Sequence, residues 1–202
     1  MKLALLLPLL LAAADPVAVL SAVRKAYTSS PSSTSRFVQT YAPAGFAAAS
    51  PEAGSVTLQA PDLVRFDYDG PEGKTFTFDG KAARQYVAAD RQMIIRTLRP
   101  GDKEKLPLLF LESPEAVLSR FTVTAAEAAG GIVELKLDPK AASEAPRILL
   151  SVGASGEVTR LVVTDAAGNR TTFTFSDKAA GPRRPASDFA LKPPAGTKIL
   201  AD

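Results

Sequence analysis

The chain has 202 residues, no cysteine and no histidine, and its formal net charge is +3. Without cysteine and histidine, Ser-His-Asp and Cys-His nucleophilic sites are excluded, as are the usual zinc and copper ligands. A charge this small, with no dense run of lysine and arginine, is not typical of nucleic-acid-binding proteins. We therefore expect no metal, no cofactor and no nucleic-acid partner.

The first fourteen residues have the pattern of a secretory signal peptide. Lys2 is the positive start, residues 3–11 are apolar, and Ala12-Ala13-Ala14 precedes Asp15. This pattern predicts cleavage after Ala14, and the apolar run is shorter than the about 20 residues that span a bilayer. Bacterial lipoproteins carry their lipid on a cysteine, which is absent here. We therefore expect residues 15–202 to form one soluble, monomeric, periplasmic domain.

Two segments have helical patterns. Asp15-Pro16 suits a helix start, because aspartate caps and proline fits the first helical position, and apolar residues then recur at helical spacing over residues 16–27. The second segment covers residues 106–119. It begins with an apolar run, and Ser113-Pro114-Glu115 then provides a cap, a first helical position and an acidic first turn.

Elsewhere the hydrophobic period is two, which predicts strands. Asp79-Gly80 is a hairpin signal, and glycine-containing turns separate the later strands. We expect one large, curled antiparallel sheet with the helices over its open side. The predicted strands include residues 36–41, 55–59, 64–68, 76–78, 121–123, 132–137, 148–152, 158–164 and 171–175; Tyr86 and residues 93–95 mark two more, and residues 188–191 the last.

Large side chains gather on one face of this predicted sheet. The alternation by itself fits either an ordinary core beneath the helices or the lining of a cavity. Asp67 and Asp69 share the opposite face of their strand, so we interpret them as solvated residues and not as a glycosidase pair. The residues predicted for the apolar face are Phe37, Val64, Phe66, Tyr68, Phe76, Phe78 and Tyr86.

Several short stretches occur in the order and spacing of a known family. They are Arg36-Phe37-Val38-Gln39, Pro61-Asp62-Leu63-Val64-Arg65-Phe66, Phe76-Thr77-Phe78-Asp79-Gly80-Lys81, Leu106-Pro107-Leu108-Leu109, residues 162–169, and Phe189 to Gly196 with its F-x-x-x-P-x-G pattern. Over nearly its whole mature length the chain resembles the LolA family of periplasmic carriers of outer-membrane lipoproteins. The resemblance implies an unclosed antiparallel β-barrel, or half-barrel, which is covered by a helical lid and encloses an apolar cavity.

The resemblance also implies how the cavity is used. Acyl chains of the cargo would lie against the seven face residues, under a lid that includes Leu20, Val23, Leu108 and Leu109. Cargo would come from an inner-membrane ABC lipoprotein-releasing transporter and go to an outer-membrane lipoprotein receptor, without covalent chemistry.

One residue departs from the family pattern. Many members have an arginine before the proline that corresponds to Pro61, and this chain has Ala60. Arg65 is expected on the opposite face from Phe66 and does not replace it, so lid control is expected to differ. Four alternatives stay open: another lipid as cargo, a sensing or binding module of the same fold, a carboxylate-dependent hydrolase, and a structural envelope protein with a filled core.

Overall fold

The computed structural model describes residues 14–98, 102–103, 106–141 and 145–201. The predicted signal peptide therefore lies outside the described residues, apart from Ala14. None of the helices in the described part has the length and apolar character needed to cross a bilayer. The elements are α1 (Pro16–Thr28), β1 (Ser32–Ala42), β2 (Glu52–Gln59), β3 (Leu63–Tyr68), β4 (Lys74–Asp79), β5 (Ala82–Val87), β6 (Gln92–Thr97), η2 (Pro107–Leu111), α2 (Pro114–Arg120), β7 (Phe121–Ala128), η3 (Ala129–Gly131), β8 (Ile132–Pro139), β9 (Arg147–Val152), β10 (Val158–Thr164), β11 (Arg170–Gly181), η4 (Ala186–Asp188) and β12 (Lys198–Ala201).

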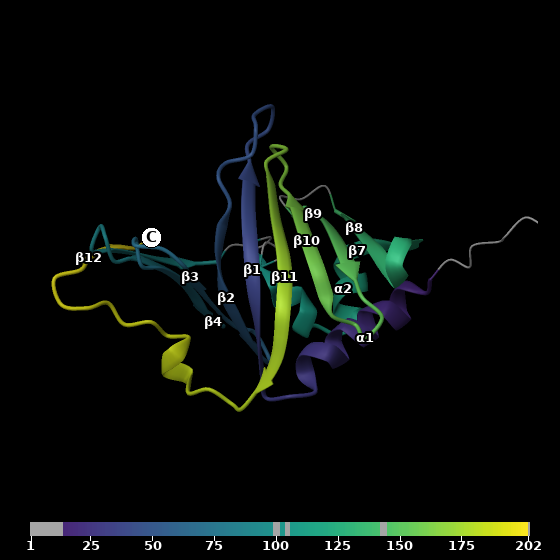
Figure 1. The fold of residues 1–202 in the computed structure, drawn as a ribbon, viewed down its shortest axis with the longest axis horizontal. Coiled ribbons are helices and arrows are strands. Elements are labelled where there is room, and N and C mark those ends of the chain that lie inside the picture. Colours follow the sequence, from purple (N-terminus) through teal and green to yellow (C-terminus); the bar gives the residue numbers. More distant parts are fainter. Residues whose placement is uncertain (1–13, 99–101, 104–105, 142–144, 202) are drawn as a thin grey trace, which may run out of the picture.

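The strands form one curled sheet that does not close into a barrel (Figure 1). Their order is β12-β6-β5-β4-β3-β2-β1-β11-β10-β9-β8-β7. All neighbours pair antiparallel except β12, which lies parallel to β6. The predicted unclosed antiparallel sheet with helices is confirmed, and β12, which was not predicted as a strand, adds one parallel pair at its edge.

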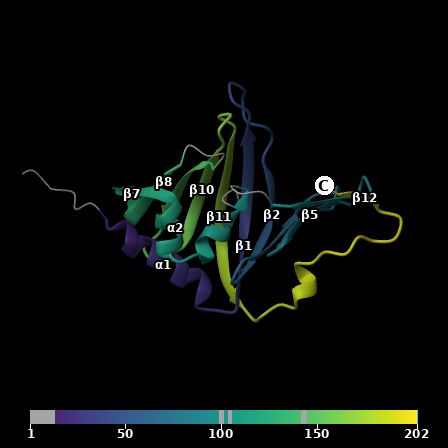
Figure 2. The same ribbon diagram turned by 180° about the vertical axis from the view of Figure 1, so that it is seen from behind.

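Helices α1 and α2 lie on the inner face of the curl, in front of β7–β11 when the molecule is seen as in Figure 2. Asp15 caps α1, because its Oδ1 accepts a hydrogen bond from Val17 N at 3.0 Å. The predicted second helical region is two elements, since Ser113 starts a new helix by accepting from Ala116 N at 3.3 Å. All five residues of η2 are buried.

Helix α1 docks closely against the β9–β10 hairpin. A β-carbon at Gly156, which has φ +83°, would lie 2.4 Å from the carbonyl oxygen of Ala22, so only glycine permits this approach. One turn further along α1, the hydroxyl of Tyr27 accepts a hydrogen bond from Val158 N at 3.2 Å. These two contacts fix the position of α1 against the β9–β10 hairpin.

The C-terminal segment covers part of the outer face of the sheet. The predicted strand at residues 188–191 is wrong: residues 186–188 form η4, and Phe189 N bonds back to Ala186 O at 3.1 Å, which is a local turn. Pro193-Pro194 then delays the last strand to β12. Phe189 is fully buried, yet it lies outside the main core cluster, as does Met93 of β6. Together with the buried Thr77, these residues indicate a small second core beneath this segment.

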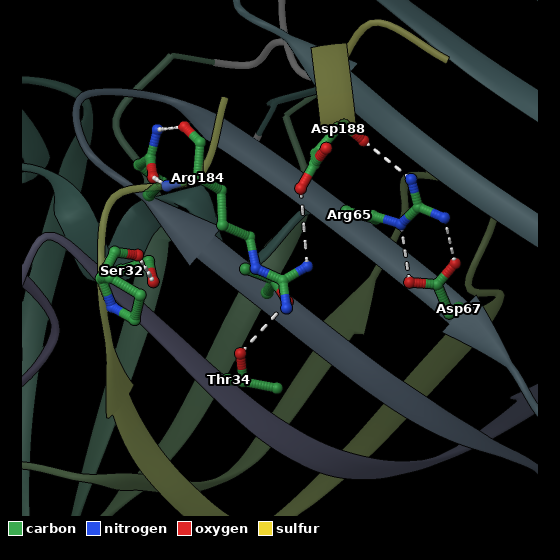
Figure 3. Close-up of polar contacts among 9 residues, drawn as sticks. Ser32, Thr34, Arg65, Asp67, Arg184 and Asp188 are labelled. Carbon is green, nitrogen blue, oxygen red and sulfur yellow. Dashed lines mark hydrogen bonds and ion pairs between the residues drawn. The ribbon is translucent and has the colours of Figure 1, made fainter. Parts of the chain in front are cut away.

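Two polar contacts fasten the segment to the sheet (Figure 3). The side chain of Gln59 bonds both backbone groups of Arg184, accepting from N at 2.8 Å and donating to O at 3.2 Å. Arg65 donates to the carbonyl oxygen of Asp188 at 2.9 Å. It also donates two hydrogen bonds, of 2.7 and 2.8 Å, to the carboxylate of Asp67. Arg65 therefore lies on the outer face, as predicted.

Replacing Arg65 with methionine is expected to loosen this segment. The change removes hydrogen bonds from a charged donor that is half-buried, and should cost about 1–2 kcal/mol of unfolding free energy. Limited proteolysis within residues 182–197 should accelerate. The matched control is Arg36→Met, because the Arg36–Asp69 pair is mostly exposed; its cost should be near zero and its proteolysis unchanged. Equal proteolysis in both variants would contradict the anchoring role of Arg65.

Candidate functional site

Six of the seven predicted face residues lie together on the inner face. Phe37, Val64, Phe66 and Phe78 are at most 2% exposed, and Tyr68 and Phe76 are half-buried. They come from β1, β3 and β4, and the antiparallel register places Val64 opposite Phe78 and Phe66 opposite Phe76. All six belong to the main core cluster or pack against it.

Tyr86 is a correction. Strands β4 and β5 are joined by the two-residue turn Gly80-Lys81, so Ala83 pairs with Phe78 and Gln85 with Phe76. Residues that pair directly share a face, which puts Ala83 and Gln85 on the inner face and Tyr86, opposite Thr75, on the outer one. Counting the register outward from the Asp79-Gly80 turn would have identified this from the sequence.

The inner face carries a continuous aromatic cluster that extends beyond the predicted residues. The ring centroid of Phe66 lies 5.2 Å from that of Phe37, 6.1 Å from that of Phe76 and 5.7 Å from that of Phe173. Phe173 stacks on Phe175 at 6.0 Å, which reaches the lid through Phe110 at 5.9 Å. The sequence pattern assigned residues 171–175 to a strand but did not place them beside Phe37, because Phe37 and its partner Phe175 are 138 positions apart in the chain.

One glycine makes room for this cluster. Gly54 of β2 lies opposite both Phe37 and Tyr68. A β-carbon there would lie 2.2 Å from the carbonyl oxygen of Asp67 and 2.8 Å from the Phe37 ring. The ring therefore lies across the backbone of β2, which only a residue without a side chain allows.

The four predicted lid residues are all buried in the same core. Leu20 and Val23 come from α1, and Leu108 and Leu109 from η2. Phe110, which was not predicted, joins them to α1, since its ring centroid lies 5.0 Å from that of Tyr27.

The segment ahead of η2 also contacts the β2–β3 side of the sheet. Lys103 lies 3.7 Å from the carboxylate of Asp62, two residues after Ala60, and 5.1 Å from the Phe78 ring centroid. Lys103, four residues before the start of η2, thus contacts this side of the sheet through an ion pair with Asp62 and through the ring of Phe78.

Burial changes the ionisation of two tyrosines here. Burial raises the pKa of the Tyr27 hydroxyl to about 12, opposed by the hydrogen bond from Val158 N and supported by Glu157. Burial likewise raises the pKa of Tyr68, with a smaller contribution from Glu52. Both phenols are therefore neutral hydrogen-bonding groups at physiological pH.

Alkaline pH is expected to destabilise the protein through Tyr27. The unfolded tyrosine loses its proton near pH 10 and the folded one near pH 12, so the folded state holds more protons between these values and stability falls as pH rises. At pH 12 the loss should be roughly 2 kcal/mol. Urea unfolding at pH 9 and pH 12 measures it. Tyr27→Phe should be less stable at pH 9, because Val158 N loses its partner, yet less sensitive to the rise in pH; equal sensitivity would refute this assignment.

A pocket of about 270 Å³ opens on the inner face beside the aromatic cluster. It is smaller than most ligand sites, which measure about 300–1,000 Å³, and Leu106, the residue before η2, lines one side of it. The residues that line it are Gln39, Phe66, Tyr68, Lys74, Phe76, Gln85, Leu106, Thr171 and Phe173.

The acidic residues of β3 and its end are each paired with an arginine. Asp67 is bound to Arg65, and Asp69 pairs with Arg36, whose hydrogen bond lowers the pKa of that carboxyl. Within the described ranges, no group of three or more acidic side chains is placed to hold a metal ion.

Comparison with known proteins agrees with this architecture. The model of a family described as "Outer membrane lipoprotein carrier protein LolA" matches residues 28–192. The chain belongs to the LolA family. The LolA match begins at the end of α1 and includes the six inner-face residues and η2.

Individual relatives and one solved structure are similar to the chain over most of its length. An outer-membrane lipoprotein carrier protein of Pseudomonas fluorescens strain Pf0-1 is 28% identical over 74% of this chain and 72% of its own. The protein of the same description from Pseudomonas syringae pv. tomato is 25% identical over 84% and 81%. An uncharacterized conserved protein of Thermus thermophilus has the same fold, with a TM-score of 0.53, 13% identity and coverage of 92% and 98%.

Proposed function

We propose that this chain is a periplasmic carrier that binds the acyl chains of lipoproteins and moves them from the inner to the outer membrane. The aromatic cluster on the inner face, at the edge of an open pocket, carries the proposal. Burying acyl chains there is favourable by about 0.8 kcal/mol per CH₂ group, and no covalent chemistry is needed. Membership of a family of lipoprotein carriers supports it.

The closed lid sets a condition on binding. The pocket is too small for several acyl chains, and Phe110 of η2 occupies the place next to Phe175. Cargo would therefore have to displace η2 from the aromatic cluster. α1 is a poor candidate for this movement, because Gly156 and Tyr27 hold it to the β9–β10 hairpin. In this proposal Leu108, Leu109 and Phe110 form the movable part of the lid, and Leu20 and Val23 its fixed support.

The proposed route has two ends. Residues 1–14 would direct export, an inner-membrane ABC lipoprotein-releasing transporter would load the carrier, and an outer-membrane lipoprotein receptor would accept the cargo. Release needs only a receptor site that is more apolar or more accessible than the aromatic cluster. Because the closed lid competes with cargo for that cluster, the carrier itself favours release.

Mass spectrometry of the protein purified from periplasm tests the proposal. Co-purified acylated proteins, at up to one per carrier, are the expected result. Addition of the protein to spheroplasts should also release lipoproteins into a soluble complex. A protein that carries no acylated protein and releases none would overturn the proposal, and enrichment of another lipid would replace the cargo.

A further inference from the structure

The pocket beside Phe66 has an apolar end and a polar end. Phe66, Phe76 and Phe173 line the apolar end, toward the lid. Lys74 on β4 and Thr171 on β11 lie two residues beyond Phe76 and Phe173 on the same inner face, and they form the other end with Gln39 on β1. Gln85 on β5 pairs directly with Phe76 and therefore belongs to the apolar end. Three strands thus contribute a polar side chain to this end of the pocket, where Gln39 bonds the hydroxyl of Tyr68.

Several hydrogen-bond donors in this region have no partner among the described residues. The Tyr68 hydroxyl donates to Gln39 Oε1 at 2.6 Å, which orients the amide of Gln39 and leaves its NH₂ group available. Within the described part of the chain, no hydrogen bond uses Nε2 of Gln39 or the hydroxyl of Thr171. These groups line the pocket, so they are placed to donate to a ligand.

The charge of the polar end is balanced. Lys74 is the single cation among the described lining residues, and it is paired with Glu52, which faces Gln39 across β1 and β2. Its ammonium group also lies 3.9 Å from the Tyr68 ring centroid. An anionic headgroup would find no uncompensated positive charge here, whereas an uncharged acceptor would find donors.

We propose that this polar end binds the ester carbonyl groups of a diacylglyceryl group, with the acyl chains running from it along Phe66, Phe76 and Phe173. Ester carbonyls are uncharged acceptors attached directly to acyl chains, so they match both ends of the pocket. The inference rests on the proposed carrier function and adds to it. The aromatic cluster binds the acyl chains, and Gln39 and Thr171 bind the ester carbonyls at the start of these chains.

Two ligands with identical hydrocarbon chains distinguish the proposed carbonyl site from acyl-chain binding alone. One is a synthetic lipopeptide with an S-(2,3-diacyloxypropyl)cysteine, and the other is its dialkyl ether analogue, which lacks both carbonyls. Binding is measured by displacement of a fluorescent fatty-acid analogue. The unmodified protein should bind the ester ligand about tenfold more tightly, the effect of one or two neutral hydrogen bonds. A phosphatidylglycerol arm tests for headgroup binding instead.

Conservative variants assign the preference to residues. Thr171→Val keeps the shape and removes the donor. Gln39→Met keeps the length of the side chain and removes its NH₂ group without adding a charge, at the cost of the acceptor for Tyr68. Each should reduce the ester preference about threefold to tenfold and leave the affinity for the ether ligand within about twofold. Thr172→Val is the matched control, because Thr172 is the next residue on the same strand and faces outward; it should change neither affinity.

The outcomes are distinguishable. If both ligands bind equally tightly and the variants change nothing, the carbonyl site is wrong while the carrier function stands. If phosphatidylglycerol binds more tightly than the lipopeptide and Lys74→Gln abolishes the difference, the polar end is a phosphate site and this inference is overturned. If no acylated ligand binds at all, the carrier proposal fails, and the carbonyl site with it.

Discussion

Replacing Phe66 with glutamate is expected to abolish uptake of acylated cargo. Phe66 is 2% exposed and has rings on several sides, including Phe37, Phe76 and Phe173. A buried, unpaired carboxylate costs several kcal/mol, so water would enter the cluster to solvate it. Since each 1.4 kcal/mol is a factor of ten in affinity, lipoprotein release from spheroplasts should fall by at least about tenfold.

The matched control is Asp67→Asn, one residue along the same strand and on the outer face. Asp67 is partly exposed and paired with Arg65, so the change should cost less than about 1 kcal/mol and leave release nearly intact. Phe76→Glu is a second test at a half-buried position of the same pocket, where a charge is easier to accommodate in the folded protein. If these variants remain folded by circular dichroism yet release cargo as Asp67→Asn does, the aromatic face does not bind acyl chains.

Replacing Phe110 with alanine is expected to lower stability and to strengthen cargo binding at the same time. Phe110 is 1% exposed and packs between Tyr27 and Phe175. Losing such a side chain costs roughly 3–5 kcal/mol. η2 is a short 3₁₀ element with no side-chain cap at its start, so burial is what holds it in place. The substitution should therefore destabilise the packing of η2 against the aromatic cluster more than it destabilises the sheet.

A weaker closed state removes the competition between lid and cargo. If closure of the lid reduces the population that can bind, the apparent affinity for a fluorescent fatty-acid analogue should rise about tenfold for each 1.4 kcal/mol by which closure is weakened. Urea unfolding and a binding titration measure the two effects. Phe46→Ala is the control, because Phe46 is 77% exposed and should change both by little. A Phe110→Ala protein that loses stability and affinity together would show that η2 forms part of the binding surface.

The sequence determined those features that depend on local period and local hydrogen bonds. Alternation put Val64 and Phe66 on one face of their strand, and Phe76 and Phe78 on one face of theirs, since neighbouring side chains of a strand point to opposite sides. Asp15 and Ser113 were identified as helix caps because a capping side chain bonds a backbone group two or three residues away. Resemblance to the LolA family then supplied the unclosed sheet, which the period of two could not distinguish from a closed one.

Only the tertiary structure decided which distant residues meet. Tyr86 is not such a case, because its outward side follows from the local hairpin register counted from the Asp79-Gly80 turn. Phe173 and Phe175 join the aromatic cluster because β11 pairs with β1. The C-terminal segment crosses the outer face of the sheet and ends in β12, which pairs parallel with β6. The polar end of the pocket combines β1, β4 and β11. Such contacts are selected by the total burial of the folded chain, which no local stretch of sequence contains.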